Sequence, residues 1–429
     1  MIELIPFLMF LLICLCLMSG YPVAFTLGGS ALVFASIGIV TGHFDPNLLK
    51  ALPDRLYGTM NNGTLIAVPL FIFMGMVLER SRIAEELLDS LSALFGNLRG
   101  GLGITVVLVG MLLAASTGIV GATVVTLGLI ALPTLLRHGY HPAIASGLLC
   151  ATGTLGQIIP PSIALVLLGD VLSSAYQQAQ LSMGSLNTQT VSVGDLFVGA
   201  LIPGFLLVAL YIVFFMLLAV FKPALLPVYK EEKTANKTLS VSAILLSLLP
   251  PVLLIMTVLG SILAGAATPT EAAGIGATGA LFLAFIKKQL SLRELFSVGQ
   301  KSVEVTSMIF MILIGASLFS LVFRGFGGDH QVEAVFTQLP GGAFGAMLLV
   351  MAVIFLLGFI LDFIEITFVV VPIVAPVLLA MGIDPVWLGI MIALNLQTSF
   401  LTPPFGFTLF YLRGVAPPSV TTAQIYRGV

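Results

Sequence analysis

Apolar residues run along this chain in stretches long enough to cross a lipid bilayer, with short polar segments between them. A crossing helix needs about 20 apolar residues, because it rises about 1.5 Å per residue. We therefore predict an all-α polytopic membrane protein. The apolar runs fall near residues 2–19, 22–42, 64–79, 102–136, 143–169, 194–221, 240–264, 270–286, 301–325, 345–381 and 386–412.

Two of these runs, 102–136 and 345–381, are too long for one crossing and too short for two. Each has a polar or glycine-containing interruption near its middle, "STGIVGAT" at 116–123 and "LDFIEIT" at 361–367. This pattern predicts two re-entrant helical hairpins, which enter the membrane partway and return on the same side.

Two further runs, 143–169 and 386–412, contain residues that break helices. The first holds Gly156 and Pro160-Pro161, and the second holds Pro403-Pro404. Proline lacks the N–H that a helix needs and glycine weakens a helix. Broken helices at membrane depth are tolerated where they are buried in protein or line a cavity. We predict one broken crossing in each run.

The punctuating residues repeat at a constant separation. A shift of 243 positions places the prolines and glycines of one half on those of the other, namely Pro133 on Pro376, Gly139 on Gly382, Pro142 on Pro385 and Pro160-Pro161 on Pro403-Pro404. The predicted hairpins fall in the same register. We therefore predict a first repeat over 1–221, a linker over 222–239 and a second repeat over 240–429.

Loop charges predict the orientation, because Lys and Arg gather on the cytoplasmic side. Residues 170–195 contain neither Lys nor Arg and are predicted outside. The loops 222–238 and 287–300 carry several Lys or Arg residues and are predicted inside. The C-terminus, with Arg413 and Arg427, is also predicted inside. The first repeat then ends outside and the second ends inside. Inverted repeats with interrupted helices are typical of secondary transporters.

Two segments near the start of the chain are predicted to lie at the membrane surface. Residues 80–99 alternate charged residues with Leu and Ile at helical spacing, which predicts a cytoplasmic amphipathic arm. Residues 43–62 are predicted to be an outer loop, in which Lys50 and Arg55 balance two aspartates.

Composition agrees with a membrane protein and narrows the function. The chain is 59% hydrophobic and 8% charged, against about a quarter charged in a soluble protein. No basic block indicates nucleic acid. The three cysteines lie in apolar runs and the four histidines are scattered, so we expect neither a disulfide framework nor a metal centre.

The helix breaks supply the candidate chemistry. Freed carbonyl groups coordinate a cation such as sodium, and exposed N–H groups at a half-helix start attract an anion. Small hydroxyl, amide and acidic residues gather at both predicted sites. The first site combines Ser116, Thr117, Gly118, Thr123, Thr152, Gly153, Thr154, Gly156 and Ser162. The second combines Asp362, Glu365, Thr367, Asn395, Gln397, Thr398, Ser399 and Thr402.

Five motifs resemble the large membrane subunit of tripartite ATP-independent periplasmic (TRAP) transporters, the DctM-like family. They are "GTLGQIIPPS" (153–162), "ATPTEAA" (267–273), "GFILDF" (358–363), "VPIVAPV" (371–377) and "NLQTSFLTPPFG" (395–406). The resemblance covers essentially the whole chain. Related subunits often continue into a further apolar helix where this chain ends at "IYRGV".

The resemblance implies a sodium-driven importer of small carboxylates with an elevator mechanism in the bacterial inner membrane. It also implies a periplasmic substrate-binding protein and a small four-helix membrane subunit as partners, with membrane lipid around them. The forms "DFIEIT" (362–367) and "NLQTSFLTPPFGFTLFYLRG" (395–414) look most like the branch that takes α-keto acids, lactate and related organic acids.

We assign the predicted site residues to three groups, with no cofactor and with Na⁺ as the coupling ion. Substrate contacts are assigned to Ser116, Thr117, Thr154, Gln157, Pro160, Ser162, Asn395, Gln397 and Pro403. The first sodium site is assigned to Ser116, Gly118, Thr123, Gly153 and Gly156. The second is assigned to Asp362, Glu365, Thr367, Thr398, Ser399 and Thr402.

Several residues have a structural alternative. Asp362 and Glu365 either shape a sodium site or bind a neighbouring helix end. Glu271 is expected to cap a helix. Arg324 either reaches to the membrane surface, docks the binding protein or attracts the anion. The polar stretch 173–190 is expected to be a solvated loop, with docking of the binding protein as the alternative.

Three other functions compete with the tripartite importer. A self-sufficient sodium/carboxylate symporter differs only in needing no binding protein. An intramembrane hydrolase needs a paired aspartate, a zinc motif or a serine with a histidine partner at membrane depth, and the apolar runs contain none. A channel or scaffold would not need two inverted hairpins.

Overall fold

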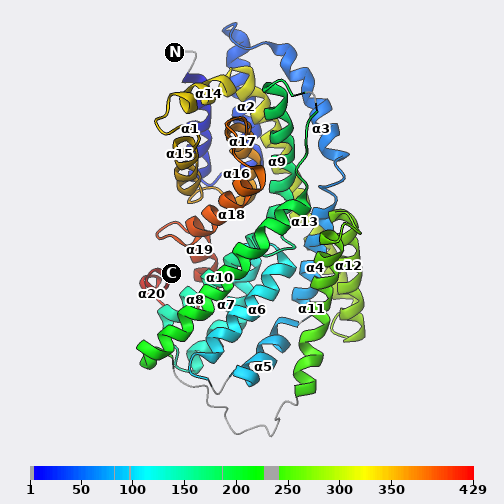
Figure 1. Cartoon of the computed structure of the whole chain (residues 1–429), viewed down its shortest axis with the longest axis vertical. Helices are drawn as coiled ribbons and strands as arrows, with labels where there is room; N and C mark the ends of the chain where they lie inside the picture. Colours follow the sequence, from blue (N-terminus) through cyan, green and yellow to red (C-terminus); the bar gives the residue numbers. More distant parts are fainter. Residues whose placement is uncertain (1–3, 82, 96–97, 186, 227–240) are drawn as a thin grey trace. The chain divides into compact units, whose positions relative to one another are not determined.

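The computed structural model describes residues 4–81, 83–95, 98–185, 187–226 and 241–429. Regular structure in this part of the chain is helical, with no strand, which confirms the all-α prediction (Figure 1). The helices are α1 Ile5–Met18, α2 Val23–Val40, α3 Leu52–Met60, α4 Ala67–Arg80, α5 Ile83–Phe95, α6 Gly101–Thr117, α7 Val120–Arg137, α8 Pro142–Thr154, α9 Ile163–Ser182, α10 Val193–Phe221, α11 Val241–Leu263, α12 Pro269–Ile286, α13 Leu292–Gly325, α14 Gly328–Gln338, α15 Gly342–Leu357, α16 Phe363–Val369, α17 Val371–Ala380, α18 Pro385–Leu401, α19 Phe407–Val415 and α20 Thr422–Gly428.

The helices form two compact units, and each unit contains segments from both predicted repeats. Unit 1 comprises Met1–Ile66, Leu167–Leu196 and Val303–Leu396. Unit 2 comprises Ala67–Val166, Phe197–Ser302 and Gln397–Val429. The repeat boundaries stay a prediction about internal symmetry, and residues 227–239 of the predicted linker 222–239 lie outside the described residues.

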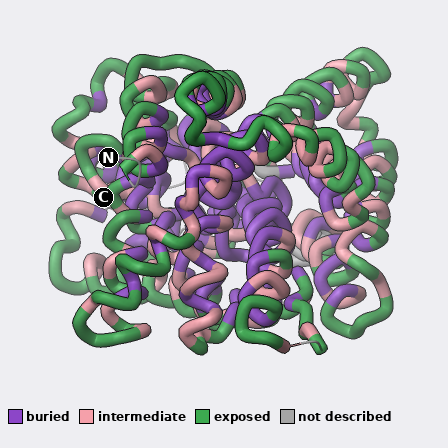
Figure 2. Tube along the Cα trace, turned by 90° about the horizontal axis from the view of Figure 1, so that it is seen from above, coloured by how far each residue is buried: buried purple, intermediate pink, exposed green. Residues whose placement is uncertain are grey.

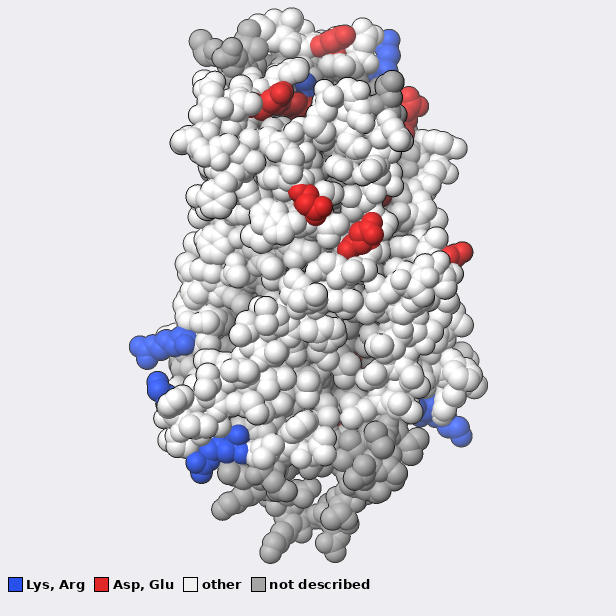
Figure 3. Space-filling view, in the orientation of Figure 1, with Lys and Arg blue, Asp and Glu red and all other residues white. Residues whose placement is uncertain are grey.

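The helices have the length and surface of a multi-pass membrane protein. Among the described residues, α2, α7, α10, α12 and α13 are long and apolar enough to cross a membrane, and the bent pair α16–α17 adds a sixth. Outward turns of α10 expose large apolar side chains, such as Ile202 at 80% and Phe221 at 75%. Figure 2 shows exposed outer turns around buried ones, and most of the face in Figure 3 is uncharged, with scattered acidic and basic residues. Lipid is the solvent that such a surface requires.

Unit 2 contains the first predicted hairpin and the break of the first predicted broken helix. Helices α6 and α7 form the hairpin and turn at Gly118, whose φ of 61° suits glycine. Both helices pack on α8 at glycines. A Cβ at Gly110 would lie 2.0 Å from Thr152, and one at Gly153 would lie 2.2 Å from Val124. Small residues therefore let these backbones approach closely.

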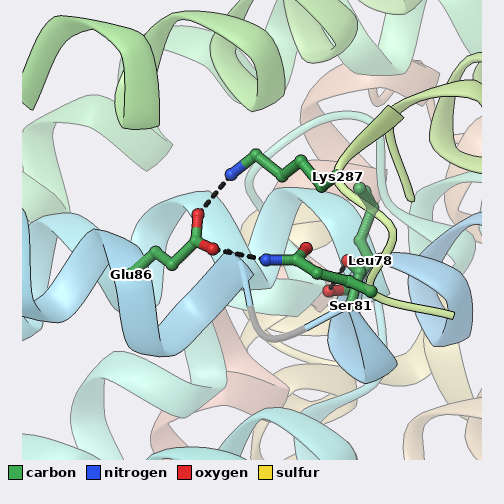
Figure 4. Close-up of polar contacts among 5 residues, drawn as sticks. Leu78, Ser81, Glu86 and Lys287 are labelled. Carbon is green, nitrogen blue, oxygen red and sulfur yellow. Dashed lines mark hydrogen bonds and ion pairs between the residues drawn. The ribbon is translucent and has the colours of Figure 1, made fainter. Parts of the chain in front are cut away.

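The predicted amphipathic arm over 80–99 contains α5, which packs on α6 and α11. The Glu86 carboxylate of α5 accepts hydrogen bonds from Lys287 and Gln289, which follow α12 (Figure 4). At the other end of α12, Thr268 and Glu271 form a capping box, so the structural role expected for Glu271 is confirmed.

In unit 1, the run 345–381 folds as α15, a break and the bent pair α16–α17. The break spans 358–362, and α16 and α17 meet at an angle of 58°. The interruption predicted at 361–367 is therefore displaced, because "FIEIT" already belongs to α16. Asp362 ends the break by capping α16.

Three predicted loops are partly helical. The segment 43–62 contains α3, α9 continues through 173–182, and α13 begins at Leu292 within the predicted loop 287–300. In α9 the reason is tertiary, because Ala175 and Ala179 are buried at 4% and 0% exposure. The polar residues between them made this stretch look like a solvated loop.

Candidate functional site

The first crossing breaks between α8 and α9. Helix α8 ends at Thr154, a single 3-10 turn covers Leu155–Gln157, and α9 begins at Ile163. The Pro160-Pro161 bond is cis, as is Pro403-Pro404. Ser162 donates hydrogen bonds to the carbonyls of Gly156 and Gln157, at 2.8 and 3.2 Å. The break is buried throughout, so its backbone groups are enclosed by protein.

The tip of the first hairpin lies against this break. A Cβ at Gly118 would lie 2.8 Å from the backbone nitrogen of Ile163, the first residue of α9. A Cβ at Gly156 would lie 3.7 Å from the backbone nitrogen of Ile119. On its other side the tip meets Gly75 of α4, where a Cβ would lie 2.8 Å from the Ser116 carbonyl oxygen. The structure thus brings together the two segments assigned to the first site.

The hydroxyl groups at the hairpin tip are buried and bonded to one another or to nearby carbonyls. Ser116 and Thr117 both donate to the Leu113 carbonyl, at 2.8 and 3.0 Å. The Thr117 and Thr123 hydroxyl oxygens lie 2.8 Å apart. A hydroxyl that donates one hydrogen bond still has lone pairs available. These oxygens can therefore accept a further donor or ligate a small cation, and sodium at this place stays a prediction.

Gln157 is the polar side chain that the break leaves unsatisfied. It is 1% exposed, and neither its amide nitrogen nor its oxygen has a hydrogen-bond partner among the described residues. The Thr152 hydroxyl of α8 is likewise buried and unpartnered there. A buried unpartnered polar group costs about 1–3 kcal/mol, so native proteins rarely keep one without a ligand, ion or water. The amide of Gln157 can satisfy both a donor and an acceptor.

The second broken crossing separates α18 from α19 at 402–406, as predicted. Thr402 donates to the Thr398 carbonyl, and Thr408 donates to the Phe400 carbonyl. Pro403 and Pro404 are exposed, in contrast to the buried Pro160-Pro161. The substrate contact assigned to Pro403 therefore differs in environment from the one assigned to Pro160.

Tyr211 of α10 links the two crossings, and sequence reasoning missed it. The Gln397 amide nitrogen donates to the Tyr211 hydroxyl at 3.3 Å. The Thr154 side chain, which donates to the Ala151 carbonyl at 2.7 Å, lies near the same hydroxyl. Thr154 and Gln397 are equivalent under the shift of 243 positions. The Gln397 oxygen is buried and lacks a partner among the described residues. The sequence did contain a signal for this residue, because Tyr211 carries the single side-chain hydroxyl in the apolar run 197–221.

The acidic residues of the second hairpin form a capping box. The Asp362 carboxylate accepts from the Phe363 N–H at 2.7 Å, and Glu365 accepts from the Asp362 N–H at 3.0 Å. This arrangement gives both carboxylates a structural role at the start of α16. The Thr367 hydroxyl is fully buried, without a partner in the described part of the chain.

The remaining members of the second predicted site are distributed over both units. Asp362, Glu365, Thr367 and Asn395 belong to unit 1, where Asn395 donates to the Met351 carbonyl at 2.7 Å. Gln397, Thr398, Ser399 and Thr402 belong to unit 2. Sodium ligation by this set stays a prediction.

Comparison with known proteins shows the family to which the chain belongs. Residues 8–429 match the family model described as "Tripartite ATP-independent periplasmic transporter, DctM component". The C4-dicarboxylate TRAP transporter large permease protein DctM of Pseudomonas aeruginosa is 33% identical, over 87% of this chain and 82% of that protein. The sialic acid TRAP transporter large permease protein SiaM of Vibrio cholerae is 28% identical, over 93% and 87%.

A solved structure shares the fold at low sequence identity. The YdaH transporter of Alcanivorax borkumensis superposes with a TM-score of 0.61 at 14% identity, over 98% of this chain and 93% of that one. This likeness concerns the fold alone. The match over residues 8–429, together with the 33% identical relative, shows that this chain belongs to the family of tripartite ATP-independent periplasmic transporters, as a DctM component.

Proposed function

We propose that this chain is the subunit through which a sodium-coupled tripartite transporter imports small carboxylates across the bacterial inner membrane. The observation that carries the proposal is the buried break at 155–162, where the hairpin tip packs against the backbone and the Gln157 amide lacks a partner among the described residues. Interrupted helices with bare peptide groups are where secondary transporters bind ions and substrate. Gln157, Gln397 and the hydroxyls of the tip then supply the side-chain contacts.

Relatives support the carboxylate class, since the names of two of them specify C4-dicarboxylates and sialic acid. The narrower choice among α-keto acids, lactate and related acids belongs to the same proposal. So do the two partners, a periplasmic binding protein that delivers the substrate and a small four-helix membrane subunit. The re-entrant insertion of the hairpins and an elevator movement complete the proposed mechanism, which the helical hairpin α6–α7 and the two broken crossings support.

Uptake into proteoliposomes tests this function. The chain is reconstituted with its small subunit, and the carboxylate is chosen as the one that most stabilises the binding protein against heat, from pyruvate, lactate and succinate. We expect uptake only when an inward sodium gradient and the binding protein are both present. Uptake that proceeds equally without sodium and without the binding protein would refute the proposal. Sodium dependence without a need for the binding protein would identify a self-sufficient symporter instead.

Asp362→Asn examines the second sodium site in the same assay. Asparagine caps helices as well as aspartate does, so the start of α16 is expected to stay intact. We expect normal amounts of folded protein and a higher sodium concentration for half-maximal uptake. An unchanged sodium dependence would leave Asp362 with its capping role alone. Asp362→Ala, which removes the cap, serves as the control for a purely structural effect.

A further inference from the structure

Unit 1 contains a polar cavity that the proposed transport site does not use. Its volume is about 500 Å³, and helices α3, α9 and α13 line it, with Phe368 and Pro372 of α16–α17 forming an apolar wall. The polar lining includes Arg55 of α3, Asn62 just after α3, Asp170 and Gln178 of α9, and Ser320 and Arg324 of α13. Two arginines in one cavity are unusual in a chain that is only 8% charged.

Arg55 has no anionic partner in the cavity. Its one hydrogen bond is a long one, 3.5 Å from a guanidinium nitrogen to the Ser317 carbonyl. Among the described residues, no carboxylate lies within 4.0 Å of it. Burial and the nearby charge of Arg324 lower the pKa of Arg55, and Asp329 opposes this. An arginine still remains charged, so the cavity contains a partly buried cation with no carboxylate within ion-pair distance among the described residues.

Arg324 is hydrogen-bonded to neighbouring groups but also has N–H donors without a partner among the described residues. One guanidinium nitrogen, Nη2, contacts the Gln178 side-chain oxygen at 3.0 Å and the Pro372 carbonyl at 3.4 Å. A second, Nε, lies 3.4 Å from the Asp329 carboxylate. The third, Nη1, has no partner in the described part of the chain. One carboxylate therefore faces two guanidinium groups, which leaves an excess positive charge.

The acidic residue of the cavity lies away from this positive end. Asp170 accepts a hydrogen bond from Asn62 at 2.8 Å, whereas Gln178, two turns further along α9, contacts Arg324. Eight residues of helix separate Asp170 from Gln178 by about 12 Å. The cavity thus has a cationic end at Arg55 and Arg324, which suits an anion, and a separate acceptor end at Asp170.

We propose that this cavity is a second carboxylate-binding site, in which Arg55 and Arg324 bind the carboxylate. The inference rests on the proposed function for its substrate class, since the carboxylate would be the transported one. It does not depend on sodium coupling. By the loop charges, 43–62 and 170–195 lie outside, so the site would lie toward the outer side of the membrane.

Protection of arginines from chemical modification tests the site directly. The purified chain with its small subunit, in nanodiscs of phosphatidylcholine and without sodium, is treated with phenylglyoxal, and each arginine is followed by peptide mass spectrometry. Pyruvate, lactate and succinate are the probes. We expect at least one of them to slow modification of Arg55 and Arg324 but not of Arg413, which bonds the Val420 carbonyl in unit 2.

Variants sharpen the assignment. Arg55→Gln should raise the probe concentration that half-protects Arg324 by about tenfold, the effect of losing one charge-assisted hydrogen bond. Lys50→Gln removes a positive charge just before α3, outside the cavity lining, and should leave protection unchanged. The same concentration in both variants would overturn the role of Arg55.

Two other results would overturn the site itself. Absence of protection by all three probes, while sodium-dependent uptake in proteoliposomes is normal, would refute this cavity and leave the proposed function standing. Anionic lipid headgroups share the chemistry of a carboxylate, so a parallel sample contains phosphatidylglycerol nanodiscs. If phosphatidylglycerol alone protects both arginines and no carboxylate does, the cavity binds lipid. Protection by a carboxylate in phosphatidylcholine, with no uptake, would support the cavity and refute the proposed function.

Discussion

Gln157 is the residue whose environment is hardest to explain without a ligand. Its amide is buried, unpartnered among the described residues and placed in the break between α8 and α9. Leaving such a buried group without a hydrogen-bond partner costs about 1–3 kcal/mol, and a bound ligand or ion would recover that energy. The same reasoning applies to the side-chain amide of Gln397. Its nitrogen donates to the Tyr211 hydroxyl, but its oxygen has no partner among the described residues.

Gln157→Leu separates binding from folding. We expect uptake to fall at least about tenfold, because a hydrogen-bonded contact to substrate or ion is lost. We expect the melting temperature in detergent to stay the same or rise, because the unsatisfied amide is replaced by an apolar group of similar size. Uptake and thermal unfolding of the same preparation measure both effects.

Thr105→Val is the matched control. Thr105 of α6 is also fully buried, and its hydroxyl lacks a partner in the described part of the chain. It lies about 18 Å along α6 from the hairpin tip, twelve residues away. This variant should keep its stability and its uptake. Equal uptake by Gln157→Leu and the unsubstituted chain would show that the amide does not contact the transported species.

At the scale of elements, the site depends on how closely α6 and α7 approach α8. Gly110 and Gly153 provide the space, and Gly118 allows the turn between the two hairpin helices. Gly75 provides the space that lets α4 approach the hairpin tip. The hairpin is therefore held on both sides by helices that meet it at glycines, which positions its hydroxyls at the break.

Gly153→Val should prevent this packing. Its added Cβ would lie 2.2 Å from Val124 of α7, a separation that real Cβ atoms do not adopt, so α7 and α8 must move apart. Overpacking of this kind typically costs about 1–3 kcal/mol. Size-exclusion chromatography and thermal unfolding should detect a lower melting temperature. Gly414→Ala is the control, since a Cβ there meets nothing within 4 Å, and an equal loss of stability in both variants would argue against the packing explanation.

At the scale of the whole molecule, the two repeats are predicted to have opposite orientations, so that their broken crossings run in opposite directions through the membrane. The prediction rests on Lys and Arg in the loops, which follow the cytoplasmic side in membrane proteins. Helices long enough to cross are present, but length does not tell which end is outside.

Cysteine labelling measures the orientation. In a chain with Cys14, Cys16 and Cys150 replaced by alanine, Met183→Cys should react with a membrane-impermeant maleimide in intact spheroplasts. Ala423→Cys should react only after the membrane is opened. Both positions are exposed, Met183 at 55%, so burial does not limit labelling. Reaction of both from the same side would show that the repeats are not inverted.

Much of the fold followed from local patterns in the sequence. The apolar runs predicted the crossing helices, because a peptide group in lipid must be satisfied within its own segment. Pro160-Pro161 and Pro403-Pro404 predicted both broken crossings, because proline cannot donate the helical hydrogen bond. The pair alone does not decide this, since Pro250-Pro251 lies inside α11. Glu271 was assigned correctly as a cap, since the motif and its hydrogen bonds span only four residues.

The tertiary structure decided what depends on partners far away in the chain. It made 173–182 helical by burying Ala175 and Ala179, and it brought Thr154 and Gln397 to Tyr211. It also placed Arg55 and Arg324, 269 positions apart, in one cavity. Whether a polar side chain is satisfied depends on which helices pack beside it, and that packing is set by contacts between helices rather than by the pattern within any one of them.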